Sequence, residues 1–376
     1  MALLLLPLPT MARKGSKVKY AVVGLGYIAQ SAILPAFRNA SKNSVLHALV
    51  SDDPRKRKLL GRKYGVDLVY DYSGFKEALS EVDAVFIALP NTLHRAYVEL
   101  AAEAGVHVLC EKPLATDTAD CEAMIEVCAA AGVKLMTAYR LHFERANLEA
   151  IRIASTRLGD LRMFTASFSN DVEPGNIRLQ EGEGGPLFDI GIYCLNAARA
   201  VFRDEPTEVF AFDASRNDAR FQKTPEMLNV VLRFPHDRLA SFTCSFGAFA
   251  GGWYEITGTK GSLRVDPAYN IAADLSHTLK IGKAKSQKTF RARDQFAPEI
   301  LYFSDCILHG RDPEPSGHEG LADVRVLRAI ERSIDEQRPI RLEPFTRSKR
   351  PSLRQEISRP VNGRAALVHA SDPSPN

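Results

Sequence analysis

Three polar side chains stand where a folded chain could use them for proton transfer. Asp189 and Tyr193 are four residues apart, so they share one face if this segment is helical. Lys112 follows an apolar run and precedes Pro113, which holds the lysine in place. The spacing leaves a structural interpretation open, because an aspartate at a helix N-cap and a tyrosine in a half-buried stripe are both common.

A glycine-rich turn near the N-terminus predicts a dinucleotide site. Residues 20–23 are an apolar run typical of a buried strand, and the chain then breaks at Gly24 and turns into a helix. Gly24 permits the tight turn, Gly26 lets a pyrophosphate approach the backbone, and Ala29 allows close helix–strand packing. The free N–H groups at the helix start would face the phosphates. Ordinary βα turns can also be glycine-rich, so the prediction depends on the pattern of strands and helices after the turn.

Strands and helices alternate regularly after this turn. We expect strands at 45–50, 68–70, 84–89, 106–110 and 134–138, and helices at 28–40, 54–64, 75–79, 93–104 and 119–131. Such alternation predicts an α/β fold with a doubly wound parallel sheet. A ligand would then bind outside the carboxyl ends of the strands.

The end of the second expected strand bears on the cofactor. An acidic side chain there favours NAD, whereas a small hydroxyl with nearby cations favours NADP. Ser51 is followed by Asp52 and Asp53 and then by the cationic run at 55–58, which includes Lys56. The cations resemble a phosphate clamp, although such a run is also typical of a solvated helix face. Asp52 and Asp53 argue for NAD unless they cap the helix. We favour NADP, and NAD stays possible.

Charge and composition exclude several classes of protein. The chain of 376 residues is long enough for two domains and is 45% hydrophobic. Its net charge of +4 arises at the ends, since residues 1–19 and 345–376 each carry +4 and the body between them carries −4. The body therefore shows no sign of a nucleic-acid-binding face. No apolar run approaches the length of a membrane span.

The two ends and the cysteines favour a cytoplasmic protein. Residues 1–17 are expected to be a disordered lead, because the apolar start precedes its positive charges, the reverse of a secretory signal. Met11 could equally be the true start. Residues 345–376 form a basic, Pro- and Ser-rich extended tail that we expect to be disordered, although it could wrap a partner subunit. The six cysteines form no C-x-x-C pair, which is typical of reduced thiols.

Several motifs together resemble one enzyme family. These are Gly24-Leu25-Gly26-Tyr27-Ile28-Ala29, Pro90-Asn91-Thr92-Leu93-His94, Glu111-Lys112-Pro113, Ala138-Tyr139-Arg140-Leu141-His142 and the stretch 184–193. They look like the signature run of the glucose–fructose oxidoreductase/inositol dehydrogenase family, and the likeness covers roughly residues 18–344. The Glu-Lys-Pro motif joined to the later Asp-x-x-x-Tyr is specific, whereas the glycine-rich turn alone is not. Within the family, the chain is most similar to the sugar-oxidising branch.

The resemblance implies a domain plan. Residues 18–142 would form a Rossmann domain, and residues 143–344 a substrate and oligomerisation domain with a large, open, mostly antiparallel sheet. We expect strands at 161–170, 208–214, 228–234, 239–246, 254–258 and 262–265. In such enzymes one face of that sheet often forms the interface of a homodimer or homotetramer. Phe242 and Phe246 could be buried there, or they could face the helices of their own domain.

The resemblance also assigns roles to residues. Tyr193 would be the general base that takes a proton from the anomeric hydroxyl of a sugar, Lys112 would favour its phenolate, and Asp189 would orient the lysine or the substrate. Arg140 and His142 are further candidates for binding sugar hydroxyls. Inositol dehydrogenase-like members carry His where this chain has Tyr193, which points to an aldose. No cluster has metal-ligand spacing. The expected cofactor-binding residues are Gly24, Gly26, Tyr27, Ile28, Ser51, Lys56, Pro90, Asn91, His94, Glu111, Lys112 and Arg140.

These observations predict an NADP-dependent oxidoreductase that converts an aldose to its lactone. The cofactor could stay bound while a second sugar accepts the hydride. Two alternatives remain: a nucleotide-binding regulator of the same fold that has lost turnover, and a reductase of a different cyclic ketone or polyol. The sequence does not identify the sugar, because the residues that bind its ring hydroxyls lie in loops whose positions the sequence does not give.

Overall fold

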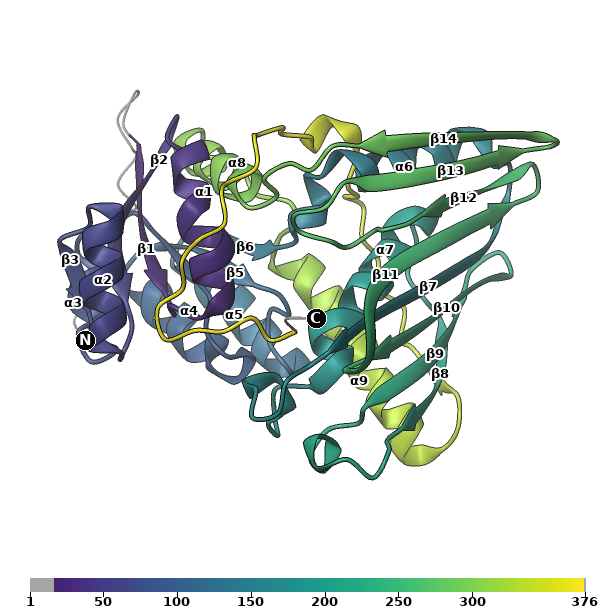
Figure 1. The fold of residues 1–376 in the computed structure, drawn as a ribbon, viewed down its shortest axis with the longest axis horizontal. Helices are drawn as coiled ribbons and strands as arrows, with labels where there is room; N and C mark the ends of the chain where they lie inside the picture. The colour runs from purple at the N-terminus through teal and green to yellow at the C-terminus, as the bar shows by residue number, and fades with distance from the viewer. Residues whose placement is uncertain (1–16, 375–376) are drawn as a thin grey trace, which may run out of the picture.

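Two sheets build the molecule, and the first is the predicted parallel one (Figure 1). The computed structural model describes residues 17–374, so nearly all of the expected lead of residues 1–17 lies outside the described residues. The strand order is β3-β2-β1-β4-β5-β6, with every neighbouring pair parallel. The strands are β1 (Val18–Val23), β2 (Ser44–Val50), β3 (Leu68–Tyr70), β4 (Ala84–Ile87), β5 (His107–Glu111) and β6 (Leu135–Ala138). All residues of β4 and β6 are buried, which explains their uninterrupted apolar runs.

Helices cover both faces of this sheet, as its alternation with strands predicts. They are α1 (Leu34–Asn39), α2 (Pro54–Tyr64), α3 (Phe75–Leu79), α4 (His94–Glu103) and α5 (Thr118–Ala130). The expected helix at 28–40 begins as the π-helix η1 (Ala29–Ile33) and continues as α1. Pro35 lies in the first turn of α1, and since it lacks an N–H the hydrogen-bond pattern changes there.

The second sheet has nine strands in the order β14-β13-β12-β11-β7-β10-β9-β8-β15. Only the central pair β7–β10 is parallel, so the expected open, mostly antiparallel sheet is confirmed. The strands are β7 (Leu161–Asp171), β8 (Glu208–Ala214), β9 (Met227–Phe234), β10 (Arg238–Ser245), β11 (Gly247–Gly258), β12 (Gly261–Val265), β13 (Leu275–Ile281), β14 (Ala284–Phe290) and β15 (Ile340–Arg341).

The strands β13, β14 and β15, which lie at or next to the edges of the sheet, were not predicted from the sequence, for physical reasons. In β14 every residue except Phe290 is exposed, so the strand has no apolar alternation to detect. Buried positions alternate with partly buried ones in β13, but one of the buried positions is occupied by His277. Because histidine is a polar residue type, the sequence shows no clear apolar alternation there. β15 has two residues only.

Phe242 and Phe246 face the helices of their own domain. Both are buried in the core beneath α6 (Arg145–Arg157) and α7 (Ile192–Phe202), which lie on the inner face of the sheet. The expectation that these two aromatics are exposed and available to an oligomer is therefore wrong. The outer face carries a different exposed apolar group: Met163, Phe212, Val231 and Leu239.

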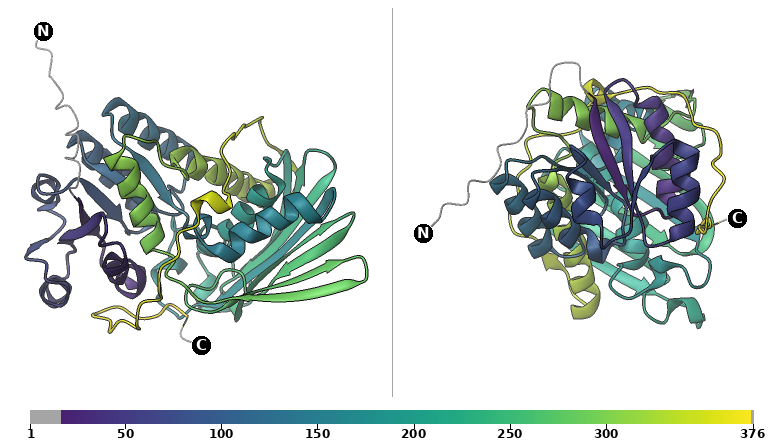
Figure 2. Two further views of the ribbon diagram at one scale, coloured as in Figure 1. Left: turned by 90° about the horizontal axis from the view of Figure 1, so that it is seen from above. Right: turned by 90° about the vertical axis from the view of Figure 1, so that its left-hand side faces the viewer.

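The last two helices join the sheets. α8 (Ala297–Leu308) packs against α1, β1 and β2 of the first sheet, although it follows the second sheet in the chain. α9 (Gly317–Glu336) lies between α5 on one side and β8 on the other (Figure 2). No helix within residues 17–374 is long and apolar enough to span a bilayer.

The tail at 345–374 follows a defined path over the body, which corrects the expectation of disorder. Its backbone carbonyl groups accept hydrogen bonds from the body, as Pro360 O does from Asn39 Nδ2 at 2.8 Å. Within the short 3₁₀ turn η7 (Leu353–Gln355), Gln355 Nε2 donates to Glu314 O at 2.8 Å. The tail is ordered by polar contacts with distant residues, which its composition does not reveal.

A buried ion cluster fixes the region where α7, α9 and the tail meet. The side chain of Arg199 is fully buried and pairs with Glu205, Glu319 and Asp323. Arg350 of the tail also pairs with Glu205, at 2.8 Å. Because these charges lie away from water, each depends on its partners.

Arg199→Leu should destabilise the protein strongly, because it leaves Glu205, Glu319 and Asp323 without their shared partner. We expect the free energy of unfolding in urea to fall by about 3–5 kcal/mol. The matched control is Arg332→Leu, which breaks an exposed pair with Glu336 and should cost about 0.5 kcal/mol or less. Equal losses in the two variants would contradict this account of the cluster.

Candidate active site

The loops that follow β4, β5 and β6 bring the candidate residues together at the carboxyl ends of the first sheet. The glycine-rich turn after β1 lies at the same edge. Gly24 has φ +90°, and a Cβ there would lie 2.4 Å from Ala88 O, so no other residue fits. A Cβ at Gly26 would meet no atom within 4 Å. Free space therefore lies directly beside the backbone of this turn, as close approach of a pyrophosphate requires.

Lys112 and Asp189 form an ion pair at the centre of the site. Lys112 Nζ donates to Asp189 Oδ1 at 3.0 Å and to the backbone Asp189 O at 2.7 Å. Arg178 Nε donates to the other carboxylate oxygen of Asp189 at 2.8 Å. Although burial opposes ionisation, the charges of Lys112 and Arg178 hold the pKa of Asp189 well below its usual range. Burial likewise opposes the charge on Lys112, but Asp189 raises the pKa of this lysine above its ordinary value.

Tyr193 lies between two cations. Lys112 Nζ is 5.0 Å and Arg140 Cζ 4.9 Å from the centroid of the Tyr193 ring. Arg140 Nε donates to Tyr193 Oη at 3.1 Å, and Arg140 Nη2 donates to Tyr269 O at 2.6 Å. Gln295 binds the remaining guanidinium nitrogen. The predicted Lys112, Asp189, Tyr193 and Arg140 therefore meet in one place.

Local helix geometry presents Asp189 and Tyr193. Asp189 lies in the π-helix η5 (Leu187–Gly191), and Tyr193 is the second residue of α7. Gly184 and Gly185 precede this segment with φ of +80° and +56°, values that favour glycine. Two glycines with positive φ therefore lead into the helix, and its first turn is a π-helix.

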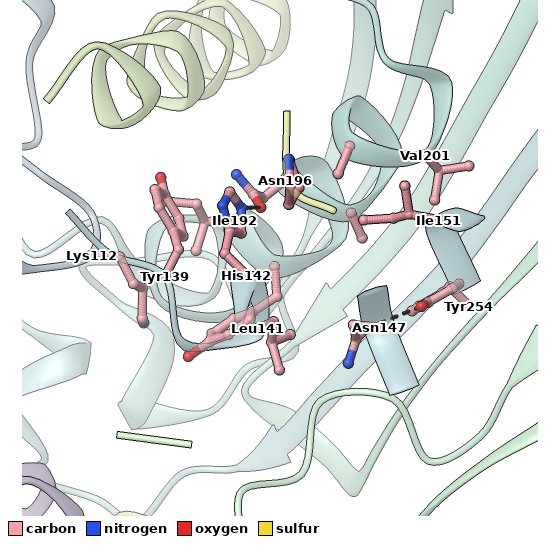
Figure 3. A pocket seen from close by; sticks show the side chains of 14 residues that line it. Lys112, Tyr139, Leu141, His142, Asn147, Ile151, Ile192, Asn196, Val201 and Tyr254 are labelled. Carbon is pink, nitrogen blue, oxygen red and sulfur yellow. Dashed lines mark hydrogen bonds between the residues drawn. The ribbon is translucent and has the colours of Figure 1, made fainter. Parts of the chain in front are cut away.

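A cavity of about 30 Å³ adjoins Lys112 and Tyr193 (Figure 3). His142 and Asn196 line it and are joined by a hydrogen bond of 2.8 Å. Ile151 and Val201 extend it between α6 and α7. Burial lowers the pKa of His142 below its ordinary value. This volume has room for about two water molecules and is smaller than a sugar ring.

His94 and Asn91 hold the loops rather than face open space. His94 is fully buried, and its ring nitrogens lie 3.1 Å from Leu89 O and 3.0 Å from Pro113 O. Burial lowers the pKa of this histidine. Asn91 N and Nδ2 donate to Glu183, at 2.8 and 2.9 Å. His94 therefore links two loops, and Pro90 stands at the start of one of them.

Two buried acidic side chains near the site have carboxyl oxygens without a hydrogen-bond partner in the part of the chain that the structure describes. Among the described residues, Glu111 Oε1 and both carboxyl oxygens of Glu299 have no hydrogen-bond partner. Burial raises the pKa of Glu111 to about 7 and that of Glu299 well above its ordinary value. Glu111 stands beside Lys112, and its Oε1 is buried as well as unpartnered within residues 17–374.

The second strand ends as an NADP site would need. Ser51 is buried, and Asp53 caps α2 by accepting from Arg55 N at 2.8 Å and Lys56 N at 3.0 Å. Of the two aspartates, Asp53 caps the helix, whereas Asp52 is exposed and does not. Of the cationic run, Arg57 binds the carbonyl groups of residues 51 and 52.

Sequence reasoning missed Arg178, Gln295, Tyr269 and Glu299. Arg178 lies in the 3₁₀ turn η4 (Ile177–Leu179) within a loop that shows no periodic pattern. Gln295 and Glu299 belong to the region that returns from the second sheet to the first, so only the tertiary fold brings them to the site. Within residues 17–374, no group of three or more His, Cys, Asp or Glu side chains is placed to hold a metal ion.

Comparisons with known proteins agree with this geometry. Residues 18–139 match the family model described as "Oxidoreductase family, NAD-binding Rossmann fold", and residues 151–264 match the "GFO/IDH/MocA C-terminal domain". A D-xylose 1-dehydrogenase (NADP(+)) from Haloferax volcanii is 28% identical over 86% of this chain and 99% of its own. An uncharacterised oxidoreductase from Rhizobium meliloti is 31% identical over 85% of this chain and 97% of its own.

Solved structures extend the comparison. An aldose-aldose oxidoreductase from Caulobacter crescentus is 37% identical, with a TM-score of 0.83, and the match covers 87% of this chain and 100% of that one. A 3-ketoreductase from Actinomadura kijaniata is 25% identical, with a TM-score of 0.76, over 85% and 98% of the two chains. The chain belongs to the Gfo/Idh/MocA family of oxidoreductases.

Lys112→Met should lower turnover by at least about a hundredfold, because it removes the cation that lies beside Tyr193 and holds Asp189. Steady-state kcat at saturating substrate and nucleotide measures the effect. The control is Lys134→Met, which removes a lysine paired with Asp312 outside the site and should leave kcat unchanged. A wild-type kcat in Lys112→Met would exclude the lysine from the chemistry.

Proposed function

We propose that this member of the family oxidises an aldose at C1 to its lactone, with NADP as the hydride acceptor. One observation carries the proposal: Tyr193 lies between Lys112 and Arg140, and Asp189 fixes the lysine. The xylose dehydrogenase and the aldose-aldose oxidoreductase among its relatives support an aldose as the substrate.

Tyr193 is the general base in this proposal. A phenol has a pKa near 10, so proton abstraction at neutral pH needs a neighbour that favours the phenolate. Two cations lie beside the Tyr193 ring, and Arg140 Nε already donates to the phenolic oxygen. The lysine stays charged because Asp189 is its partner. The tyrosine can thus take the proton of the anomeric hydroxyl while hydride leaves C1.

The residues present fit a nicotinamide dinucleotide, which supplies the hydride acceptor when bound. The open space beside Gly26 and the backbone of the turn would receive the pyrophosphate. Glu111, which stands beside Lys112, would lie next to the nicotinamide half of the cofactor. Tyr27, Ile28 and Arg140 border the same space in our proposal.

NADP is proposed over NAD because Asp53 is occupied as a helix cap. Its Oδ1 accepts from two backbone N–H groups of α2 and its Oδ2 lies 2.7 Å from His369 Nδ1, so both carboxylate oxygens are already engaged. Ser51 and Lys56 then offer a hydroxyl and a cation to a phosphate. The xylose dehydrogenase relative is described as an NADP(+) enzyme, which supports the same choice.

The direct test is the near-ultraviolet absorbance of reduced nicotinamide. Freshly purified protein receives a panel of aldoses, first without and then with added NADP. We expect absorbance to rise with at least one aldose. A rise without added nucleotide would show a retained cofactor and support a cycle in which a second sugar is reduced. No rise under either condition, in protein that binds NADP, would refute the proposal and favour a regulator of the same fold.

Tyr193→Phe is the matched variant for this assay. It keeps the ring and its packing and removes the phenolic oxygen, so turnover should disappear while nucleotide binding persists. Tyr97→Phe, which alters a tyrosine packed against Phe75 outside the site, should keep both. Wild-type turnover in Tyr193→Phe would remove the tyrosine from the mechanism.

A second candidate is the reverse direction on a keto sugar, which the similarity to a 3-ketoreductase favours. The same absorbance would then fall when a keto sugar is added to protein and NADPH. An aldose panel that fails while a keto sugar succeeds would make this the function.

We also propose that the outer face of the second sheet joins subunits into a homodimer or homotetramer. Leu239 lies opposite Met163, and Val231 opposite Ser241, so their side chains share this face with Phe212. Val231→Glu should shift the species seen in sedimentation velocity toward the monomer. Asn229→Glu, on the same strand and face, is a milder control. A wild-type protein that sediments as a monomer would refute the interface.

A further inference from the structure

We propose that residues 368–374 form a strap over the adenosine end of the dinucleotide site, and that the strap must open to admit or release the cofactor. This inference rests on the proposed function, since it takes NADP as the ligand. It assigns a role in nucleotide exchange to the C-terminal segment, which contributes none of the catalytic or cofactor-binding residues proposed for the site. Here "the strap" means Val368 to Ser374.

The strap is bound to the helix that starts at the glycine-rich turn. Gln30 is buried, its Nε2 donates to Val368 O at 2.9 Å, and its Oε1 accepts from Val368 N at 2.8 Å. The same Gln30 Nε2 contacts Leu25 O, within the turn itself. Tyr27, also in the turn, donates from Oη to Asp372 Oδ2 at 2.8 Å. Burial and this carboxylate raise the pKa of Tyr27 to about 12, so the hydroxyl remains a donor.

A second contact lies where the adenosine ribose is expected. His369 Nδ1 is 2.7 Å from Asp53 Oδ2, and its Nε2 is 3.2 Å from Arg55 Nη1. Asp53 caps α2 directly after β2, at the strand end that distinguishes NADP from NAD. His369 has φ +44°, so the chain turns at this residue. The strap therefore spans from the turn after β1 to the start of α2.

The far end of the strap reaches the second domain. Ser374 Oγ donates to Asp171 O at 2.9 Å, and Glu173 N donates to Pro373 O at 3.0 Å. Asp171 is the last residue of β7. Figure 1 shows the yellow tail crossing in front of α1 toward the second sheet. The strap thus closes one side of the space between the two domains.

The strap borders the nucleotide site without filling the space beside the glycine-rich turn. Its contacts are with Tyr27 and Gln30 on one element and with Asp53 and Arg55 on another, while the space beside Gly26 remains free. A dinucleotide could therefore lie beneath the strap with its pyrophosphate at the turn. Such a cover would slow release, as closed loops do at other active sites.

The side chains that hold the tail on the body differ in burial, so the contacts of the strap can break before those upstream of it. Upstream, the side chains of Arg347 and Arg350 are 11% and 4% exposed in their ion pairs. In the strap, the side chain of His369 is 49% exposed where it meets Asp53. Water competes with exposed pairs, so they break more easily than buried ones. The strap can lift while the rest of the tail stays docked.

The test measures how fast NADPH leaves the protein. Full-length protein and a variant that ends at Leu367 are loaded with NADPH and chased with excess NADP, and the loss of nucleotide fluorescence gives the dissociation rate. We expect the truncated protein to release NADPH at least about tenfold faster, as loss of a few hydrogen bonds predicts. Its kcat with saturating aldose and NADP should be maintained or raised.

Point variants keep the test valid if the truncation impairs folding. The double variant Asp372→Ala, Ser374→Ala removes two strap contacts and should also release NADPH faster. Arg364→Ala alters an exposed tail side chain upstream of the strap, for which the structure gives no hydrogen bond, and should match the full-length rate. Equal NADPH dissociation rates in the full-length, truncated and double-variant proteins would contradict the proposed role of the strap. A full-length protein that binds NADPH but oxidises no sugar would refute the proposed function and leave this measurement valid.

Discussion

The ion pair between Lys112 and Asp189 is the constraint on which the site depends. The lysine follows β5 of the first sheet and the aspartate lies in η5 before α7, so the pair joins the two domains through one contact. Both groups are largely buried, and each keeps the other charged against the cost of leaving water. Because Lys112 Nζ also binds the backbone Asp189 O, the helix that carries Tyr193 is fixed beside the lysine.

Other contacts between the domains hold the same arrangement. Asn91 and Thr92 bind Glu183 of the loop before η5, so the loop after β4 is tied to the segment that leads into α7. Tyr139, just past β6, donates to Asp323 of α9 at 2.6 Å, and Asp323 belongs to the buried cluster around Arg199. The tail at 345–374 adds further hydrogen bonds and ion pairs with the body of the molecule. Rigid support of this kind suits a reaction that needs a base and a hydride acceptor in fixed positions.

The sequence predicted the first sheet well, because parallel strands buried on both faces leave strong apolar runs and their crossover helices end in glycine. The bounds of α2 and β3 were predicted to the residue. It predicted less of the second sheet, since an exposed edge strand such as β14 carries no apolar signal. Buried Phe242 shows the related difficulty that alternation reveals two faces but not which one the helices cover.

The four-residue spacing places Asp189 and Tyr193 on one helix face, but the grouping of Lys112 with them came from a family resemblance, because the lysine is far from both in sequence. Arg178 and Gln295 could not be predicted as site residues, since each belongs to a segment whose sequence shows no periodic pattern. The ordered tail was missed for a similar reason: Gln30 and Asp53 bind it from far along the chain, and composition describes only what a segment contains.

The central claim is that the site moves hydride from C1 of an aldose to nicotinamide while Tyr193 takes the hydroxyl proton. The most direct measurement uses an aldose deuterated at C1, followed by mass spectrometry of the nucleotide recovered from the denatured enzyme. The account predicts reduced cofactor that carries the deuterium, with the lactone as the other product. Reduced cofactor without deuterium, or deuterium found in the solvent, would contradict it.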